Sequence, residues 1–210
     1  QAISAARSME GGNRDGLAED GMSGGNRRGI AVGASVMVLT QVVMTAIMTM
    51  TPIHMGHHGH GLGSVGLVIG IHVGAMFLPS LVTGMLVDKV GRVPMAVAAA
   101  LTLLASGILS AAVPADSLIG LAAALALLGL GWNFGLISGT TLIVDSAASG
   151  VRAKTQGAVD VLIALTGASS GALSGVVVAH TSYAALSLAG GALAMLLIPI
   201  VAWSRRPRSR

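Results

Sequence analysis

The chain has 210 residues, of which 53 % are hydrophobic, 10 % charged and 2 % aromatic, and it carries a formal net charge of +4 and no cysteine. So few charges cannot coat a soluble protein of this size, and the composition predicts a membrane protein. The lack of cysteine excludes a disulfide scaffold, a cysteine-based zinc site and a thiol nucleophile.

Residues 1–29 differ from the rest of the chain, because they combine Gly, Ser and Asn with mixed charges and show no apolar periodicity. Such a segment cannot bury enough apolar surface to fold, which predicts a flexible cytoplasmic linker. The chain begins at Gln1 without a signal-peptide pattern, so we expect it to be a piece of a longer protein.

Six apolar segments follow, each near or above the roughly 20 residues that cross a bilayer. They cover residues 30–55, 62–87, 94–113, 117–144, 157–179 and 183–203, and residues 204–210 form a basic tail. Because lipid offers no hydrogen bonds to an exposed backbone, each segment must be a helix. The sequence predicts an all-α membrane protein with a six-helix transmembrane domain at residues 30–203.

The basic residues all fall on one side of this predicted topology. Every Lys and Arg lies before the first segment, in the loops after the second and fourth segments, or after the sixth. The positive-inside rule then places both termini in the cytoplasm and predicts a multi-pass protein of the cell membrane. Anionic lipid at the inner surface accounts for the positive charge, so nucleic acid is not expected as a partner.

Two stripes of glycine mark helix faces that allow close packing. They are Gly66, Gly70 and Gly74 in the second segment and Gly167, Gly171 and Gly175 in the fifth. A spacing of four residues places each set on one face of its helix. Packing within the six-helix bundle and packing against a second bundle are both open interpretations.

The second segment ends in GMLVDKVGRVP, residues 84–94. A carboxylate at Asp88 faces the negative end of its own helix dipole, so it needs a partner such as Arg92 or the N-terminus of another helix. This stretch resembles the cytoplasmic loop signature of the major facilitator superfamily. It matches at Gly84, Leu86, Asp88, Lys89, Gly91 and Arg92 and departs at Val93.

The resemblance covers residues 30–203, because GLGWNFGLISGTTLIVD and RAKTQGAVD resemble the fourth and fifth helices of one half of such a transporter. A polar linker, six spans and a basic tail resemble the C-terminal half. The resemblance implies a secondary transporter of a small solute, without a cofactor or enzymatic activity, whose halves rock about a midplane site. The transport that the resemblance implies could be proton-coupled efflux or proton-coupled uptake. The partner would be the missing N-terminal half or a second copy, surrounded by lipid.

On that assignment both glycine stripes lie on helices at the interface between the halves, which favours packing against a second bundle. We then expect leucine at Gly70 or Gly171 to impair transport more than leucine at Gly107. Near the basic side, Asp160 is a candidate gating charge with Arg152, and Asp145 is a second candidate partner of Arg152.

Among the polar residues inside predicted spans, one histidine and one asparagine are candidate functional residues. His72 is expected to point away from the glycine face as a buried histidine, with proton transfer or substrate contact as alternatives. Asn133 is expected either to contact substrate or to form a hydrogen bond between helices.

Four histidines gather in TPIHMGHHGHG, residues 51–61, after the first segment: His54, His57, His58 and His60. Imidazole binds zinc, nickel and copper, so a metal-handling membrane protein is an alternative function. No carboxylate or cysteine accompanies these histidines, and His54, nearest the membrane, is instead a candidate gate or proton site.

A second alternative rests on GASSG at residues 167–171, which matches the Gly-x-Ser-x-Gly pattern of serine hydrolases. A rhomboid-like intramembrane protease would need a histidine beside Ser169. His72 is the plausible base.

Overall fold

The computed structural model describes residues 26–204, and every regular element in that range is a helix. Six helical spans are long and apolar enough to cross a membrane. They are α2 (Arg27–His57), α3 (Leu62–Phe77) with α4 (Ser80–Val90), α5 (Arg92–Ala112), α6 (Leu118–Ser146), the 3-10 turn η1 (Ser149–Val151) with α7 (Arg152–His180), and α8 (Tyr183–Ala194) with α9 (Leu197–Ser204). The predicted all-α, six-span fold is confirmed, and the predicted linker and tail lie almost wholly outside the described residues.

The first span begins at Arg27 because Asn26 caps it. The Asn26 side chain accepts a hydrogen bond from the Gly29 N–H at 3.3 Å, which satisfies one free donor of the first turn. The Asn26 N–H itself donates to the Ser146 carbonyl, at 2.8 Å. Arg28 lies over the Trp203 ring, 4.4 Å from its centroid, and donates to the Trp203 carbonyl. One end of the bundle is thus tied together by α2, α6 and α9.

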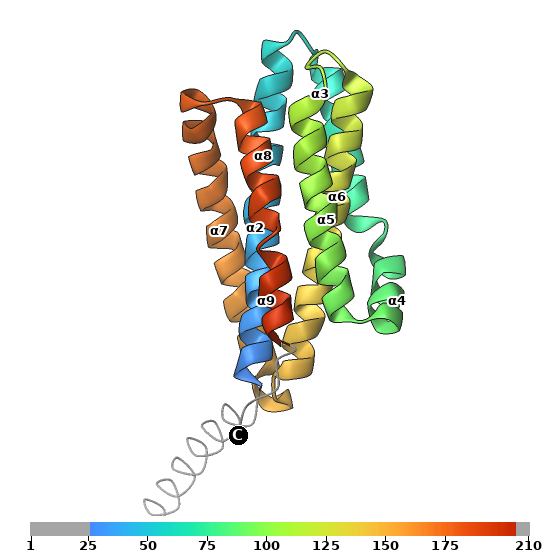
Figure 1. Ribbon diagram of the computed structural model, residues 1–210, viewed down its shortest axis with the longest axis vertical. Coiled ribbons are helices and arrows are strands. Elements are labelled where there is room, and N and C mark those ends of the chain that lie inside the picture. Colours follow the sequence, from blue (N-terminus) through green and yellow to red (C-terminus); the bar gives the residue numbers. More distant parts are fainter. Residues whose placement is uncertain (1–25, 205–210) are drawn as a thin grey trace, which may run out of the picture.

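The second span is broken in the middle. Pro79 has no N–H to donate to the Ala75 carbonyl, and a proline ring clashes with the carbonyl four residues earlier, so α3 ends at Phe77 and α4 begins at Ser80. In Figure 1, α4 lies to one side of the line of α3.

The helices form two layers. In the first layer α6 packs against both α3 and α2, and α2 packs against α7, which gives the order α3, α6, α2, α7. In the second layer α5 packs on α6, and α8 and α9 pack on both α5 and α2; this layer faces the viewer in Figure 1. The core between the layers is apolar and includes Val36, Ile47, Leu103, Leu125 and Leu128, all fully buried.

Glycines at the crossings allow helix backbones to touch. A Cβ on Gly107 of α5 would overlap the Ser187 carbonyl of α8 and lie about 3.0 Å from the Gly191 backbone. Backbone atoms cannot move aside as a flexible side chain can, so this site requires glycine. The expectation that leucine at Gly70 impairs transport more than leucine at Gly107 assumed that Gly107 has room for a side chain, and that assumption is wrong.

Gly107→Ala is expected to lower the thermal stability of the complete protein in detergent, by an overpacking cost of about 1–3 kcal/mol. Gly70→Ala is the matched control, because a Cβ there meets nothing within 4 Å. It should keep or raise stability, since alanine favours a helix over glycine by about 1 kcal/mol. Equal losses in a melting experiment on both variants would contradict the close contact of α5 with α8.

Candidate functional site

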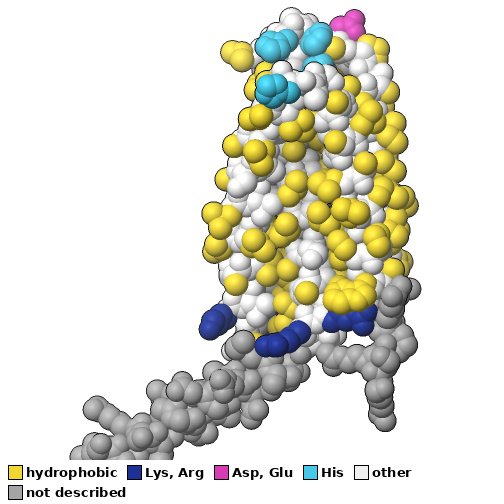
Figure 2. Space-filling model, turned by 60° about the vertical axis from the view of Figure 1, so that its left-hand side comes forward, with side chains coloured by type: hydrophobic (Ala, Val, Ile, Leu, Met, Phe, Trp, Pro, Cys, Tyr) yellow, Lys and Arg dark blue, Asp and Glu magenta, His cyan; other side chains and the backbone are white. Residues whose placement is uncertain are grey.

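The two ends of the bundle carry different charges. Figure 2 shows Lys and Arg gathered at one end and histidines at the other, with apolar side chains between them. We call these the basic end and the histidine end. The separation expected from the loops is therefore present in the folded chain.

At the histidine end, α2 is fastened to α8. The His54 ring stacks on the Tyr183 ring, with centroids 4.2 Å apart and planes 13° from parallel. The Thr51 and Tyr183 hydroxyl oxygens are 2.9 Å apart. His58 tilts over His54 at 4.5 Å, and its Nδ1 lies 2.8 Å from the His54 carbonyl oxygen. His54 thus has a packing role that the exposed His57 lacks.

The histidines do not converge on one point. The Nε2 atom of His60 lies 2.9 Å from the Ala115 carbonyl oxygen, on the neighbouring loop. Over residues 26–204, no three His, Cys, Asp or Glu side chains gather closely enough to hold a metal ion. The geometry therefore gives no support to the metal-handling alternative.

At the basic end, the loop signature joins α4 to α5. Gly91 has φ of +94°, a backbone conformation that glycine adopts without strain, and it allows the reversal expected there. Arg92 forms an ion pair with Asp145 of α6, at 2.7 Å. The predicted pairing of Asp145 with Arg152 is wrong, because Arg152 instead donates to the Ala147 carbonyl in its own turn, at 3.4 Å.

The other candidate charges of this end remain exposed. Asp88 and Lys89 lie on the surface of α4, and Asp160 lies on the surface of α7. In the described part of the chain, Asp88 forms no ion pair or hydrogen bond, and neither does Asp160. Gly84 is partly buried, with open space beside it.

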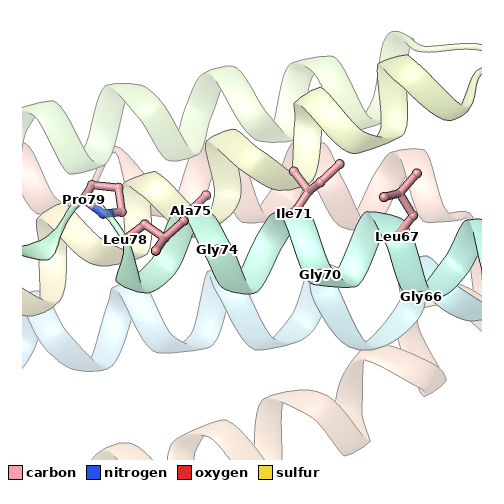
Figure 3. Close-up of a pocket in the computed structure, with 8 residues that line it drawn as sticks. All are labelled: Gly66, Leu67, Gly70, Ile71, Gly74, Ala75, Leu78 and Pro79. Atoms are coloured by element: carbon pink, nitrogen blue, oxygen red, sulfur yellow. The ribbon is translucent and has the colours of Figure 1, made fainter.

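The glycine stripe of α3 lines an open groove of about 570 Å³. Leu67, Ile71, Ala75, Leu78 and Pro79 complete its wall (Figure 3). A Cβ on Gly66 or Gly70 would meet nothing within 4 Å, and one on Gly74 would meet only Leu78. We call this the α3 groove, and nothing within the described chain covers it.

The glycine stripe of α7 behaves differently, because it packs inside the bundle on α2. A Cβ on Gly167 would lie 2.8 Å from the Gln41 amide nitrogen, and one on Gly171 would touch Thr45 and Thr49. Gly175 faces Met50. The expectation that both stripes face a second bundle is thus wrong for α7, where small residues make room for polar side chains of α2.

Those side chains belong to a group that the sequence reasoning missed. Gln41 accepts a hydrogen bond from the Trp132 indole N–H at 2.8 Å, and its amide nitrogen donates to the Thr45 hydroxyl at 3.1 Å. Phe77 packs edge-on against Trp132, with centroids 5.8 Å apart. We call Gln41, Thr45, Phe77 and Trp132 the mid-span cluster. A glutamine inside an apolar run, followed by threonines four and eight residues later, was the available signal.

His72 and Asn133 lie between α3 and α6 and are buried. The Nδ1 atom of His72 is 2.8 Å from the Leu125 carbonyl oxygen. The Asn133 amide donates to the Met76 carbonyl at 2.7 Å and to the Ser80 hydroxyl at 2.9 Å, one on each side of the break in the second span. Asn133 therefore links helices and braces the break, and neither side chain reaches the α3 groove.

The geometry does not support the protease alternative, because His72, its expected general base, does not lie beside Ser169. The Ser169 hydroxyl is exposed and donates to the Leu165 carbonyl of its own helix, at 2.8 Å. His72 is buried against α6 instead of facing Ser169.

These features define a polytopic helical membrane protein with six spans and an open groove along α3. The sequence matches the Major Facilitator Superfamily over residues 33–210, and the chain belongs to this superfamily. It is 68 % identical over 176 residues to the uncharacterized MFS-type transporter YdeG of Bacillus subtilis, covering 84 % of the chain and 41 % of that protein.

Two further relatives match over similar lengths. The uncharacterized MFS-type transporter YddS of Bacillus subtilis is 64 % identical over 174 residues, covering 83 % of the chain and 40 % of the relative. The riboflavin transporter RfnT of Brucella anthropi is 34 % identical over 166 residues, covering 78 % of the chain and 41 % of that relative. The chain spans about two fifths of the length of these relatives.

Asn133→Leu is expected to loosen α4 from α6, because it removes both hydrogen bonds across the break at a cost of about 1–3 kcal/mol. Hydrogen exchange of residues 80–90 in the complete protein should rise. Thr166→Val is the control, because that hydroxyl bonds only to Leu162 of its own helix. Unchanged exchange in Asn133→Leu would show that the amide does not brace the break.

Proposed function

We propose that this chain is the C-terminal half of a secondary transporter that carries a small solute across the cell membrane by alternating access. The chemistry is binding and release, without a cofactor or a catalytic step. Membership in the superfamily supports transport. The second bundle and the solute site are inferred from the outer side of the layer formed by α3, α6, α2 and α7, which we call the open face.

The spans at the two edges of that layer are the least buried. Only 17 % of the most apolar window is buried in the α3–α4 span and in the α7 span, against 39 to 50 % in the other four. The same face carries the α3 groove and the partly exposed Gln41 and Thr45. Polar side chains inside a span face protein or water and not lipid.

A second six-helix bundle across this face would enclose the groove and the polar side chains of α2 near the middle of the membrane, where such transporters bind their solutes. We take the partner to be an N-terminal half of the same protein, with a second copy as the alternative. The unmatched three fifths of the relatives leave room for that half.

We place the basic end, and with it both chain termini, in the cytoplasm, since the positive-inside rule applies to short loops of this kind. Asp88 and Asp160 have no partner among residues 26–204, and we propose that they act as gating charges with partners on the other half. The Arg92–Asp145 pair holds α5 to α6 beside them.

We propose a neutral organic molecule as the solute and a proton gradient as the driving force. The relative named as a riboflavin transporter supports the solute class and makes riboflavin a first compound to test. Uptake or efflux that collapses with a protonophore would support the coupling, and transport unaffected by it would refute that coupling.

The open face can be tested without knowing the solute, because this chain has no cysteine of its own. Single cysteines are introduced into the complete protein after replacing any cysteine elsewhere. Gly70→Cys and Thr45→Cys should react in membranes with a charged thiosulfonate reagent, because a water-filled cavity permits the thiolate. Ala105→Cys, exposed on α5, is the matched lipid-facing control and should stay unlabelled. Equal labelling at Gly70 and Ala105 would contradict the proposal.

The orientation has its own test. Asp116→Cys, in the exposed loop at the histidine end, should react with an impermeant maleimide on intact cells. Ser149→Cys, exposed at the basic end, should react only after the membrane is permeabilised. The reverse pattern would place the termini outside.

A further inference from the structure

The amide of Gln41 is held in one orientation. The indole N–H of Trp132 can only donate, so the atom that it meets at 2.8 Å must be the amide oxygen. The amide nitrogen therefore points away from Trp132, and one of its hydrogens goes to the Thr45 hydroxyl, at 3.1 Å. Within residues 26–204 its second hydrogen has no acceptor.

Thr45 is exceptional among the threonines of its helix. The hydroxyls of Thr40, Thr49 and Thr51 each donate to the carbonyl four residues earlier, at 2.6 to 2.8 Å. The Thr45 oxygen instead accepts from Gln41, and its O–H makes no such bond in the described chain. Two donors, one amide and one hydroxyl, are thus left unused on a partly exposed face inside a membrane span, where an unused donor is costly.

A second aromatic ring, that of Phe77, packs on Trp132. Phe77 ends α3 and is 57 % exposed, and its edge-to-face contact with Trp132 leaves ring surface free. The chain has only five Phe, Tyr and Trp residues in all, and Trp132 of this pair bonds directly to the Gln41 amide. Gly167 lets the α7 backbone pack close to the amide, because a Cβ there would lie 2.8 Å from the amide nitrogen.

We infer that Gln41, Thr45 and Phe77 form a binding subsite for a flat, uncharged heterocycle whose carbonyl oxygens or ring nitrogens accept the two donors while its ring stacks on Phe77. The donors specify acceptors, and the ring specifies a flat apolar surface. No Lys, Arg, Asp or Glu of the described residues bonds to the mid-span cluster, which favours an uncharged solute. The inference rests on the proposed function and names its substrate class.

The test uses the complete purified protein and three probes. Lumazine and alloxazine are flat rings with carbonyl oxygens, and arabinose is an uncharged solute without a ring system of that kind. Binding is measured by quenching of tryptophan fluorescence in a Trp203→Phe background, which leaves Trp132 as the one tryptophan of this chain. Lumazine or alloxazine should bind and arabinose should not.

Thr45→Val keeps the shape of the side chain and removes the donor, so it should weaken binding about threefold to tenfold. Thr49→Val is the matched control on the same helix, because its hydroxyl is already bonded to the Thr45 carbonyl. Phe77→Leu should weaken binding and Phe77→Tyr should restore it. Melting temperatures of all variants show whether each one folds.

Equal binding by Thr45→Val and Thr49→Val would overturn the subsite while leaving the transport function intact. Transport of arabinose, with no binding of either ring, would overturn the substrate class alone. A protein whose Gly70→Cys and Thr45→Cys variants resist labelling would instead refute the open face, and with it the proposed function.

Discussion

The bilayer offers no hydrogen bonds, so every polar group in a span must find its partner within the protein, and this constraint shapes the bundle. Hydroxyls on α2 bond to their own helix, as at Thr40 and Thr49. Ser106 reaches across to the Ala124 carbonyl of α6, at 2.8 Å. Asn133 supplies a donor to the Met76 carbonyl at the break made by Pro79. Side chains, and not only backbone, complete the hydrogen bonding of the helices.

Within the described residues, the buried His72 Nε2, Ser110 Oγ and Asn133 Oδ1 atoms have no hydrogen-bond partner, and two further unused donors lie on a partly exposed face. Gln41 and Thr45 keep unused donors on the face that also bears the α3 groove, and that face is otherwise apolar and glycine-rich. At the basic end Asp88 is likewise left without a partner in the described residues. A lipid-facing surface would carry neither feature. The simplest physical account is a second bundle that covers this face and leaves a wet cavity between the two.

The length and hydropathy of the segments were enough to predict six helices, and the loop charges predicted the separation seen in Figure 2. The partners of individual charges and glycines were harder to predict, because they depend on which helices are neighbours in the fold. Asp145 bonds to Arg92 across α5 and α6, although Arg152 is nearer along the sequence. The two glycine stripes have the same spacing, yet one is open and the other packs on α2. The mid-span cluster joins three helices, so no single segment revealed it.

The central claim is that the face formed by α3, α6, α2 and α7 meets a second helical bundle across a solute cavity. A structure of the complete protein in a lipid nanodisc tests it most directly. The account predicts that helices from outside this chain cover α3 and α7, with the α3 groove and the Gln41 amide opening into an enclosed aqueous space. Lipid density along the α3 groove, with the other helices packed on α5 or α8 instead, would contradict it.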